Sequence, residues 1–180
     1  MSKKKTLKHL DRADQRLSAL LRHLDSRDNA TLNQQPSTGG WSVIQIMHHL
    51  ILAEKASLGY VQKKLSFNPT LKKAGIAAEY RLQLVNLLFL LPKPFQAPAG
   101  VGDEALPKEA DYQTTKEEWL NNRRALRAFL ADLPDERFGR ELYKHPLAGK
   151  MTLSGMVRFF GTHVKRHLGQ IDRTLKDVEA

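Results

Sequence analysis

The sequence predicts an all-α protein: a four-helix bundle with one additional short helix between the second and third long helices. Three observations support this fold class. Apolar residues recur at steps of three and four along four long segments, the spacing of one helix face. Capping-box patterns stand before two of these segments. Strand signals are scarce, with no clean alternation and no Asn-Gly hairpin turn.

The first long helix is predicted over about residues 4–26, where leucines form a single apolar stripe. The stripe consists of Leu7, Leu10, Leu17, Leu20, Leu21 and Leu24. Pro36, Gly39 and Gly40 then interrupt the pattern. Residues 29–40 are therefore predicted to form a loop.

The second long helix is predicted to begin at Ser42, which forms a capping-box pattern with Gln45, and to end at Asn68-Pro69. A shorter helix is predicted over residues 74–91, closed by Pro92 and Pro94. Residues 93–113 contain several Pro and Gly residues and are predicted to be irregular.

A second capping-box pattern, Thr114 with Glu117, predicts the start of the third long helix, which Pro134 ends. A loop containing His145-Pro146 is predicted before the last helix, which begins near Thr152 and runs to about residue 178. The length of 180 residues suits one compact domain. We therefore expect a single helical-bundle domain over residues 1–180.

Composition narrows the chemistry and the location. The chain has no cysteine, which excludes disulfides and thiolate ligands, so a metal site must use imidazole, carboxylate and water. Such ligands favour zinc, nickel, iron or manganese. The basic N-terminus is not followed by an apolar stretch, and the most apolar segment, residues 82–91, is about half the length needed to span a bilayer. A cytoplasmic location and no membrane partner are expected.

The formal charge of +10 allows two interpretations. One is attraction to nucleic acid or another polyanion, and the other is a solvated basic surface. Lys and Arg residues are spread along the chain, apart from residues 3–5 and the pair Arg123 and Arg124, and no nucleic-acid motif accompanies them. The solvated surface is the favoured interpretation.

The strongest chemical signal is the pair His163 and His167. Residues four apart lie on the same helix face, close enough to share a metal ion. Both lie on one flank of the apolar arc of the last helix. The arc consists of Leu153, Val157, Phe160, Val164, Leu168, Ile171 and Leu175. The alternative is a pair of partly buried histidines bonded to neighbouring groups.

A third ligand could come from His48 or His49, and helical periodicity alone does not choose between them. Both lie beyond the apolar stripe of the second helix, on opposite sides. His49 shares its flank with small residues, Ala53 and Ala56, which favours it only slightly.

Two segments resemble a known family. Residues 40–54, GWSVIQIMHHLILAE, resemble the helix-2 signature of the DinB-like (DinB/YfiT) superfamily. Residues 145–171, HPLAGKMTLSGMVRFFGTHVKRHLGQI, resemble its C-terminal signature of HP, then G, then HxxxHxxQI. The resemblance implies a bundle with an unusual down-up-up-down order and a divalent-metal triad formed by His49, His163 and His167. It also suggests a homodimer.

Three further residues each allow a functional and a structural role. Gln170 follows His167 by three residues and could orient its imidazole, or be a surface glutamine. Glu54 lies near the centre of the second helix's apolar stripe, so a buried carboxylate there needs a partner. It could act as a general base beside the metal, although a structural pair with an Arg or a Tyr hydroxyl is favoured. For His145, bracing of a loop is favoured over metal ligation.

Three imidazoles leave a coordination position open, as in catalytic metal sites. The leading hypothesis is therefore a metal-dependent enzyme that acts on a small molecule. The resemblance implies thiol S-transfer or hydrolysis, with a low-molecular-weight thiol as one candidate substrate. The alternatives are a non-catalytic metal-binding interaction protein and, less favoured, a basic nucleic-acid-binding protein.

Overall fold

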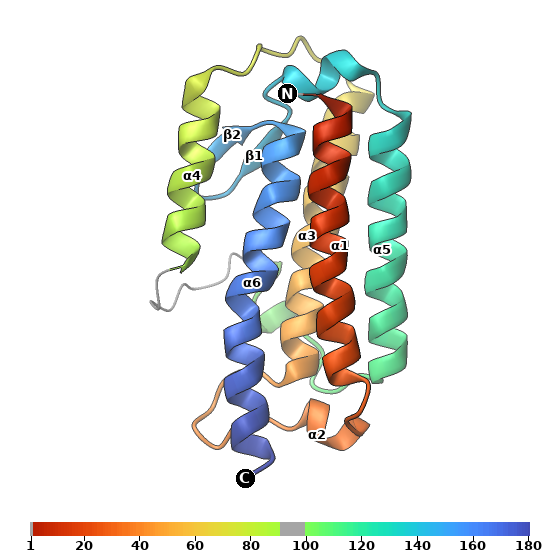
Figure 1. Cartoon of the computed structure of the whole chain (residues 1–180), viewed down its shortest axis with the longest axis vertical. Coiled ribbons are helices and arrows are strands. Elements are labelled where there is room, and N and C mark those ends of the chain that lie inside the picture. Colours follow the sequence, from red (N-terminus) through yellow and green to blue (C-terminus); the bar gives the residue numbers. More distant parts are fainter. Residues whose placement is uncertain (1, 91–99) are drawn as a thin grey trace.

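The computed structural model describes residues 2–90 and 100–180 and has the predicted all-α bundle. Its four long helices are α1 (Lys3–Leu24), α3 (Val43–Ser66), α5 (Tyr112–Asp132) and α6 (Leu153–Val178). Figure 1 shows α1 and α6 running in one direction and α3 and α5 in the other. Each of α1 and α3 packs against both α5 and α6. The chain therefore follows the down-up-up-down order that the resemblance implied.

The additional short helix is also present. Helix α4 (Ile76–Leu90) lies outside the ring of four, packed on α6 and on a small hairpin (Figure 1). Leu82, Val85 and Phe89 are buried on its inner side. The predicted end of this helix at Leu91, and the prolines Pro92 and Pro94, lie outside the described residues.

The predicted loop 29–40 contains one more helix, α2 (Asn29–Asn33), so that prediction was partly wrong. The carboxylate of Asp28 accepts a hydrogen bond from the Thr31 N–H at 2.7 Å and caps the helix. Leu32 is fully buried and anchors it in the core. A capping residue and a single apolar anchor thus suffice for one turn and a half of helix, too short to produce a stripe.

The capping box predicted for Thr114 and Glu117 was also wrong. Helix α5 begins two residues earlier than Thr114, and its N-cap is Asp111, whose side chain accepts the Thr114 N–H at 2.8 Å. The Thr114 hydroxyl donates to the same carboxylate at 2.8 Å, so it supports the cap without being the cap. The capping box at Ser42 and Gln45, by contrast, is present as predicted.

A two-stranded hairpin precedes α6, in a segment that was predicted to be a loop. Strands β1 (Tyr143–His145) and β2 (Gly149–Met151) pair antiparallel, with His145 opposite Gly149. Gly149 has φ of 75°, the left-handed value found at the end of three-residue hairpin loops. Each strand is too short to show an alternating pattern. Two 3-10 turns, η1 (Asp103–Ala105) and η2 (Asp135–Gly139), complete the described elements.

Two apolar clusters form the core along the length of the bundle. Phe138 and Phe160 are the largest fully buried side chains of one cluster, and Trp119 is the largest of the other. Among the described residues, no helix combines the length and the apolar character that crossing a membrane requires.

Candidate metal centre

Three histidines from two helices converge inside the bundle. The Nε2 atom of His163 lies 3.1 Å from Nε2 of His49 and 3.1 Å from Nε2 of His167. One ligand nitrogen from each residue lies within 4.8 Å of the other two. All three side chains are buried. The structure therefore brings together the three residues named by the sequence analysis.

The helices position these side chains for simple geometric reasons. His163 and His167 stand one turn apart on α6, on the side that packs against α3. His49 lies on the second turn of α3, whose start is fixed by the capping box of Ser42 and Gln45. Because α3 and α6 are antiparallel neighbours (Figure 1), the beginning of α3 lies beside the second half of α6.

Hydrogen bonds donated by the outer ring nitrogens fix the tautomers of two of the three histidines. Nδ1 of His49 lies 2.6 Å from the backbone carbonyl of Val101, so it must carry the proton and donate it. Nδ1 of His167 lies 2.9 Å from the side-chain Oε1 of Gln170 and donates in the same way. In a neutral imidazole the other nitrogen is then an acceptor. The Nε2 atoms of His49 and His167 therefore both present lone pairs to the common centre.

The two Nε2 lone pairs that meet at the common centre are best satisfied by a positive charge. A proton on Nε2 of His163 can be donated to one neighbouring lone pair at a time, which leaves the other unsatisfied. Burial lowers the pKa of His49. It also lowers the pKa of His163 well below 6.5 and that of His167 to about 3, reinforced by the neighbouring rings. All three imidazoles are therefore neutral at pH 7, which is the state that binds a metal ion.

The spacing of the nitrogens suits a divalent ion. A tetrahedral ion with metal–nitrogen bonds of about 2.0–2.1 Å holds its ligand nitrogens about 3.3 Å apart. The two Nε2 separations of 3.1 Å are close to that value. Outer hydrogen bonds from the ring N–H to a carbonyl or an amide are the usual way in which a metal-binding histidine is oriented. The residues present thus fit a three-histidine metal centre.

Aromatic side chains surround the three imidazoles. Trp41 lies with its ring centroid 4.9 Å from that of His49 and stacks at 6.5 Å on His167. Phe159 stacks at 5.3 Å on His163, and Phe89 of α4 meets the same ring edge to face at 5.5 Å. These walls lower the local polarity, which strengthens electrostatic interactions inside the centre.

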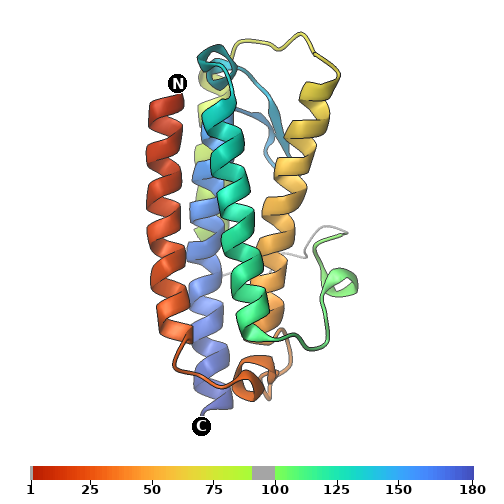
Figure 2. The same ribbon diagram turned by 90° about the vertical axis from the view of Figure 1, so that its right-hand side faces the viewer.

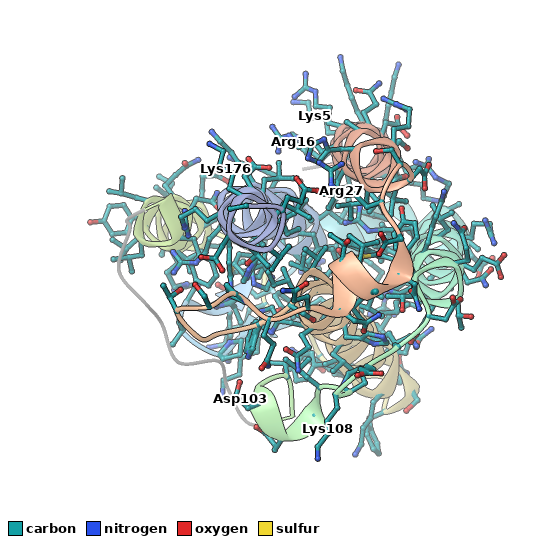
Figure 3. The ribbon with its side chains drawn as sticks, turned by 90° about the horizontal axis from the view of Figure 1, so that it is seen from below. Lys5, Arg16, Arg27, Asp103, Lys108 and Lys176 are labelled. Atoms are coloured by element: carbon teal, nitrogen blue, oxygen red, sulfur yellow. The ribbon has the colours of Figure 1, made fainter. Side chains whose placement is uncertain are left out.

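A segment on the outer side of α3 supports this wall. The indole N–H of Trp41 donates to the Asp103 carboxylate at 2.5 Å. Figure 2 shows the segment 100–111 running along the outer side of α3, and Figure 3 shows Asp103 on it, on the side of the bundle away from α1. The same segment supplies the Val101 carbonyl. Residues 100–103 therefore hold both the indole and the His49 imidazole in place.

The other histidines considered for the site lie elsewhere. His48 points toward α5, where its Nε2 lies 3.2 Å from the Thr115 hydroxyl. His145 accepts hydrogen bonds on Nδ1 from the N–H groups of Leu147 and Ala148, each at 3.1 Å. It therefore braces the hairpin loop, as the favoured interpretation of the sequence had it. Neither residue joins the cluster of ligand nitrogens.

Glu54 is buried beside an arginine. Its two carboxylate oxygens accept hydrogen bonds from Arg123 at 2.5 and 2.7 Å, and Oε2 also accepts from the Trp119 indole at 3.3 Å. This is the structural pair with an arginine that the sequence analysis favoured. Both oxygens of this carboxylate are therefore engaged in hydrogen bonds within the fold. Glu54 is also not part of the histidine cluster.

Three features of the centre were not found from the sequence. Trp41 is partly buried, packs against the apolar core and also lies against His49 and His167. Its place directly before the helix that carries His49 was an available signal. Phe89 gave a weaker signal, as part of an apolar helix. The Val101 carbonyl gave none, because any residue type supplies a backbone oxygen.

The fold and the centre together define a class of protein. Its members are all-α four-helix bundles in which three histidines from two of the helices converge. This chain belongs to the DinB superfamily, whose sequence profile matches residues 9–171. It is 24% identical over 148 residues to the uncharacterized protein YuaE of Bacillus subtilis (strain 168), an alignment that covers 82% of this chain and 85% of YuaE.

A solved structure is similar over almost the whole length. YfiT from Bacillus subtilis superposes with a TM-score of 0.56, covering 97% of this chain and 86% of YfiT at 19% sequence identity. That protein is described as a probable metal-dependent hydrolase with an unusual four-helix bundle topology. At this level of identity the similarity establishes the fold.

Proposed function

We propose that the protein is a metal-dependent enzyme that hydrolyses a small molecule at an open divalent-metal centre formed by His49, His163 and His167. The observation that carries the proposal is the convergence of three neutral Nε2 atoms with two tautomers fixed from outside. Imidazole ligands suit zinc, nickel and iron, so these ions are the first candidates.

An open coordination position supports catalysis over a purely structural role. Within residues 2–90 and 100–180, no fourth His, Asp or Glu joins the three histidines. Residue 1 and residues 91–99 contain none of these residue types. Structural zinc sites are closed by four protein ligands, whereas catalytic sites keep one position for water or substrate.

The chain's own residues have distinct roles in this proposal. Gln170 and the Val101 carbonyl orient His167 and His49 and increase the basicity of their inner nitrogens. Trp41 and Phe89 line the centre and limit the access of water. A bound divalent ion supplies Lewis acidity, which lowers the pKa of a water or thiol ligand and polarises a substrate oxygen. No side-chain general base is required, and Glu54 has no catalytic role in it.

Hydrolysis is preferred to thiol transfer because the structural neighbour YfiT is described as a probable hydrolase. Transfer of a low-molecular-weight thiol to an electrophile is the second candidate, since the same Lewis acidity serves both reactions. The choice between them depends on the substrate.

The test is a pair of activity screens on untagged protein that has been stripped with a chelator and reloaded separately with zinc, nickel, iron(II) or manganese. One screen measures ester and amide hydrolysis, and the other measures conjugation of glutathione or cysteine to small electrophiles. We expect turnover in the hydrolysis screen with at least one metal, loss of turnover in His163→Ala, and retention in His48→Ala. Equal activity in stripped and reloaded protein would exclude a metal-dependent reaction. No turnover in either screen, despite bound metal, would favour the non-catalytic alternative.

A further inference from the structure

The two ring nitrogens of His145 have different surroundings. Nδ1 accepts hydrogen bonds from the N–H groups of Leu147 and Ala148, each at 3.1 Å, so Nδ1 carries no proton. Burial lowers the pKa of His145 to about 4, so the ring is neutral at pH 7. The single proton of the neutral imidazole is therefore on Nε2. Within residues 2–90 and 100–180, no atom accepts a hydrogen bond from this Nε2–H group.

A donor that is buried in this way needs an acceptor. The His145 side chain is only 4% exposed, and a buried N–H group without an acceptor costs free energy. The hydroxyl of Tyr143, whose ring lies 6.3 Å from that of His145, does have one. Ser57 donates to the Ala53 carbonyl at 2.7 Å, so at the 3.0 Å contact between Ser57 and Tyr143 the tyrosine is the donor. Both hydroxyl protons are thus used within the fold, whereas the Nε2 proton of His145 is available to a ligand.

His145 and the metal centre share an aromatic wall. Strand β1, which carries His145, packs on α3 and α6, the two helices that supply the ligand histidines (Figure 1). The centroid of the Phe159 ring lies 4.3 Å from that of His145 and 5.3 Å from that of His163. The Phe89 ring lies 6.2 Å from His145 and 5.5 Å from His163. The two imidazoles therefore border the same pair of phenylalanine rings.

This wall determines what a ligand must supply. Phenylalanine rings can contact a hydrocarbon part of a ligand, but they offer no oxygen to accept the Nε2 proton of His145. His145 is not part of the cluster of ligand nitrogens, so it leaves the open position of the ion to another group. A small molecule that is attached to the ion by one oxygen and lies along the wall extends toward His145. An acceptor oxygen at its far end completes the missing hydrogen bond.

We infer that the Nε2–H group of His145 binds the substrate, by donating a hydrogen bond to a carbonyl or carboxylate oxygen several bonds away from the group attached to the metal ion. The inference rests on the proposed function, because it requires an ion with an open position. It assigns the substrate to a class: small molecules with an apolar middle and an oxygen group at each end. His145 then has two roles, since Nδ1 holds the hairpin loop and Nε2 holds the substrate.

The test uses matched pairs of small acids as probes. 4-Oxopentanoate and pentanoate have the same chain length and the same carboxylate for the ion, and they differ only in one ketone oxygen. 5-Oxohexanoate and hexanoate form a longer pair. Cobalt(II)-loaded wild-type protein is titrated with each acid, because the visible spectrum of cobalt(II) changes when a ligand joins the ion. We expect at least one oxo acid to bind about 3- to 10-fold more tightly than its partner, the effect of one net hydrogen bond.

Two substitutions separate the roles of the two ring nitrogens. His145→Asn keeps an acceptor near the position of Nδ1 and removes the Nε2–H group, whereas His145→Gln keeps an N–H donor near the position of Nε2. We expect the preference for the oxo acid to disappear in His145→Asn and to persist in His145→Gln. His48→Asn is the matched control, because it replaces a partly buried imidazole that bonds to Thr115 outside the centre, and it should keep the full preference. Circular dichroism checks the fold of each variant.

Nitrogen-15 NMR of zinc-loaded wild-type protein gives a second measurement that needs no variant. The Nε2 signal of His145 should shift when the preferred oxo acid is added and should not shift with its matched partner. An unchanged Nε2 signal, equal affinities within both pairs of acids, or a preference that persists in folded His145→Asn would overturn the inference and leave the metal centre in place. A cobalt(II) spectrum that none of the acids changes would instead contradict the open coordination position, and the inference with it.

Discussion

Helix α3 carries two buried polar clusters that differ in one respect. On the side toward α5, Glu54 meets Arg123, whose guanidinium also bonds to Asp14 at 3.0 Å. On the side toward α6, His49 meets His163 and His167. In the first cluster every charge has a partner of opposite sign. In the second cluster, the Nε2 atoms of three neutral imidazoles converge on one point.

The Glu54–Arg123 cluster is complete, because its charges have partners within the fold. The histidine cluster is incomplete. Burial opposes the charge on Arg123, yet the carboxylates of Glu54 and Asp14 raise its pKa overall, so its charge has counter-charges within the fold. The histidine cluster has no internal source of positive charge, because burial lowers the pKa of each imidazole. The first cluster therefore needs no bound ion, and the second is suited to hold one.

Acid should destabilise the folded protein through its buried histidines, and this is the largest expected effect. Free histidines in the unfolded chain have a pKa near 6.5. The pKa of His145 is lowered by burial to about 4 and that of His167 to about 3, and those of His49 and His163 are also lowered. Below pH 6.5 the unfolded chain therefore binds more protons than the folded one. The stability that the neutral buried histidines contribute is present in full above pH 6.5 and is lost progressively as the pH falls toward 3.

Urea unfolding of the chelator-treated protein, followed by circular dichroism between pH 7.5 and 4.5, measures this effect. We expect the midpoint to decrease below pH 6.5, and to decrease later in metal-loaded protein because the ion competes with protons. A midpoint of the chelated protein that is unchanged from pH 7 to pH 5 would contradict the proposed neutral state of the buried imidazoles.

Breaking the complete cluster should destabilise the fold without affecting metal binding. Arg123→Met leaves the carboxylate of Glu54 buried without a counter-charge, a loss of about 3–5 kcal/mol. The double variant Arg123→Met, Glu54→Leu removes both charges and should recover most of that loss. Denaturant unfolding measures stability, and elemental analysis should find the metal content of the folded variants unchanged. Loss of metal in both variants would show that the two clusters are not independent.

Removing a metal ligand should do the opposite: it should weaken metal binding without destabilising the fold. His49→Ala is expected to weaken metal binding by more than about 100-fold, beyond the range typical of outer hydrogen-bond partners. His48→Ala is a closely matched control, because it removes the adjacent imidazole, which bonds to Thr115 at 3.2 Å outside the cluster. Calorimetric titration of stripped protein with zinc measures both affinities. Equal affinities in the two variants would remove His49 from the site.

The smallest effect is expected from the outer hydrogen bonds. Gln170→Ala removes the acceptor for Nδ1 of His167 and should weaken metal binding by about 10- to 100-fold. Gln170→Glu keeps an acceptor at the same place and should bind at least as tightly as the wild type. If Gln170→Ala binds zinc like the wild type, the 2.9 Å contact does not orient the ligand.

The features that could be predicted from the sequence are those that repeat with the period of a helix. Helical periodicity located the four long helices, because each buries a long apolar stripe. The HxxxH spacing located His163 and His167, because residues one turn apart share a face. Periodicity left His48 and His49 undecided, and only the resemblance to a family separated them. The structure places His49 alone in the cluster.

The features that escaped prediction are those without a periodic signature. The hairpin strands and helix α2 each span three to five residues, fewer than a period-based argument needs. The cap at Asp111 lies only three residues before Thr114, and both side chains suit a cap. The bond from His49 to the Val101 carbonyl joins residues 52 positions apart through a backbone atom, so it is invisible in a single sequence.

We expect one ion to be bound by the Nε2 atoms of His49, His163 and His167. The most direct test is an anomalous-scattering map from crystals of untagged, metal-loaded protein. We predict a single peak at about 2.0–2.1 Å from each of the three atoms, with at least one position free of protein ligands. A map without a peak at that point, or with the ion held by His145 or Glu54 instead, would contradict the three-histidine centre.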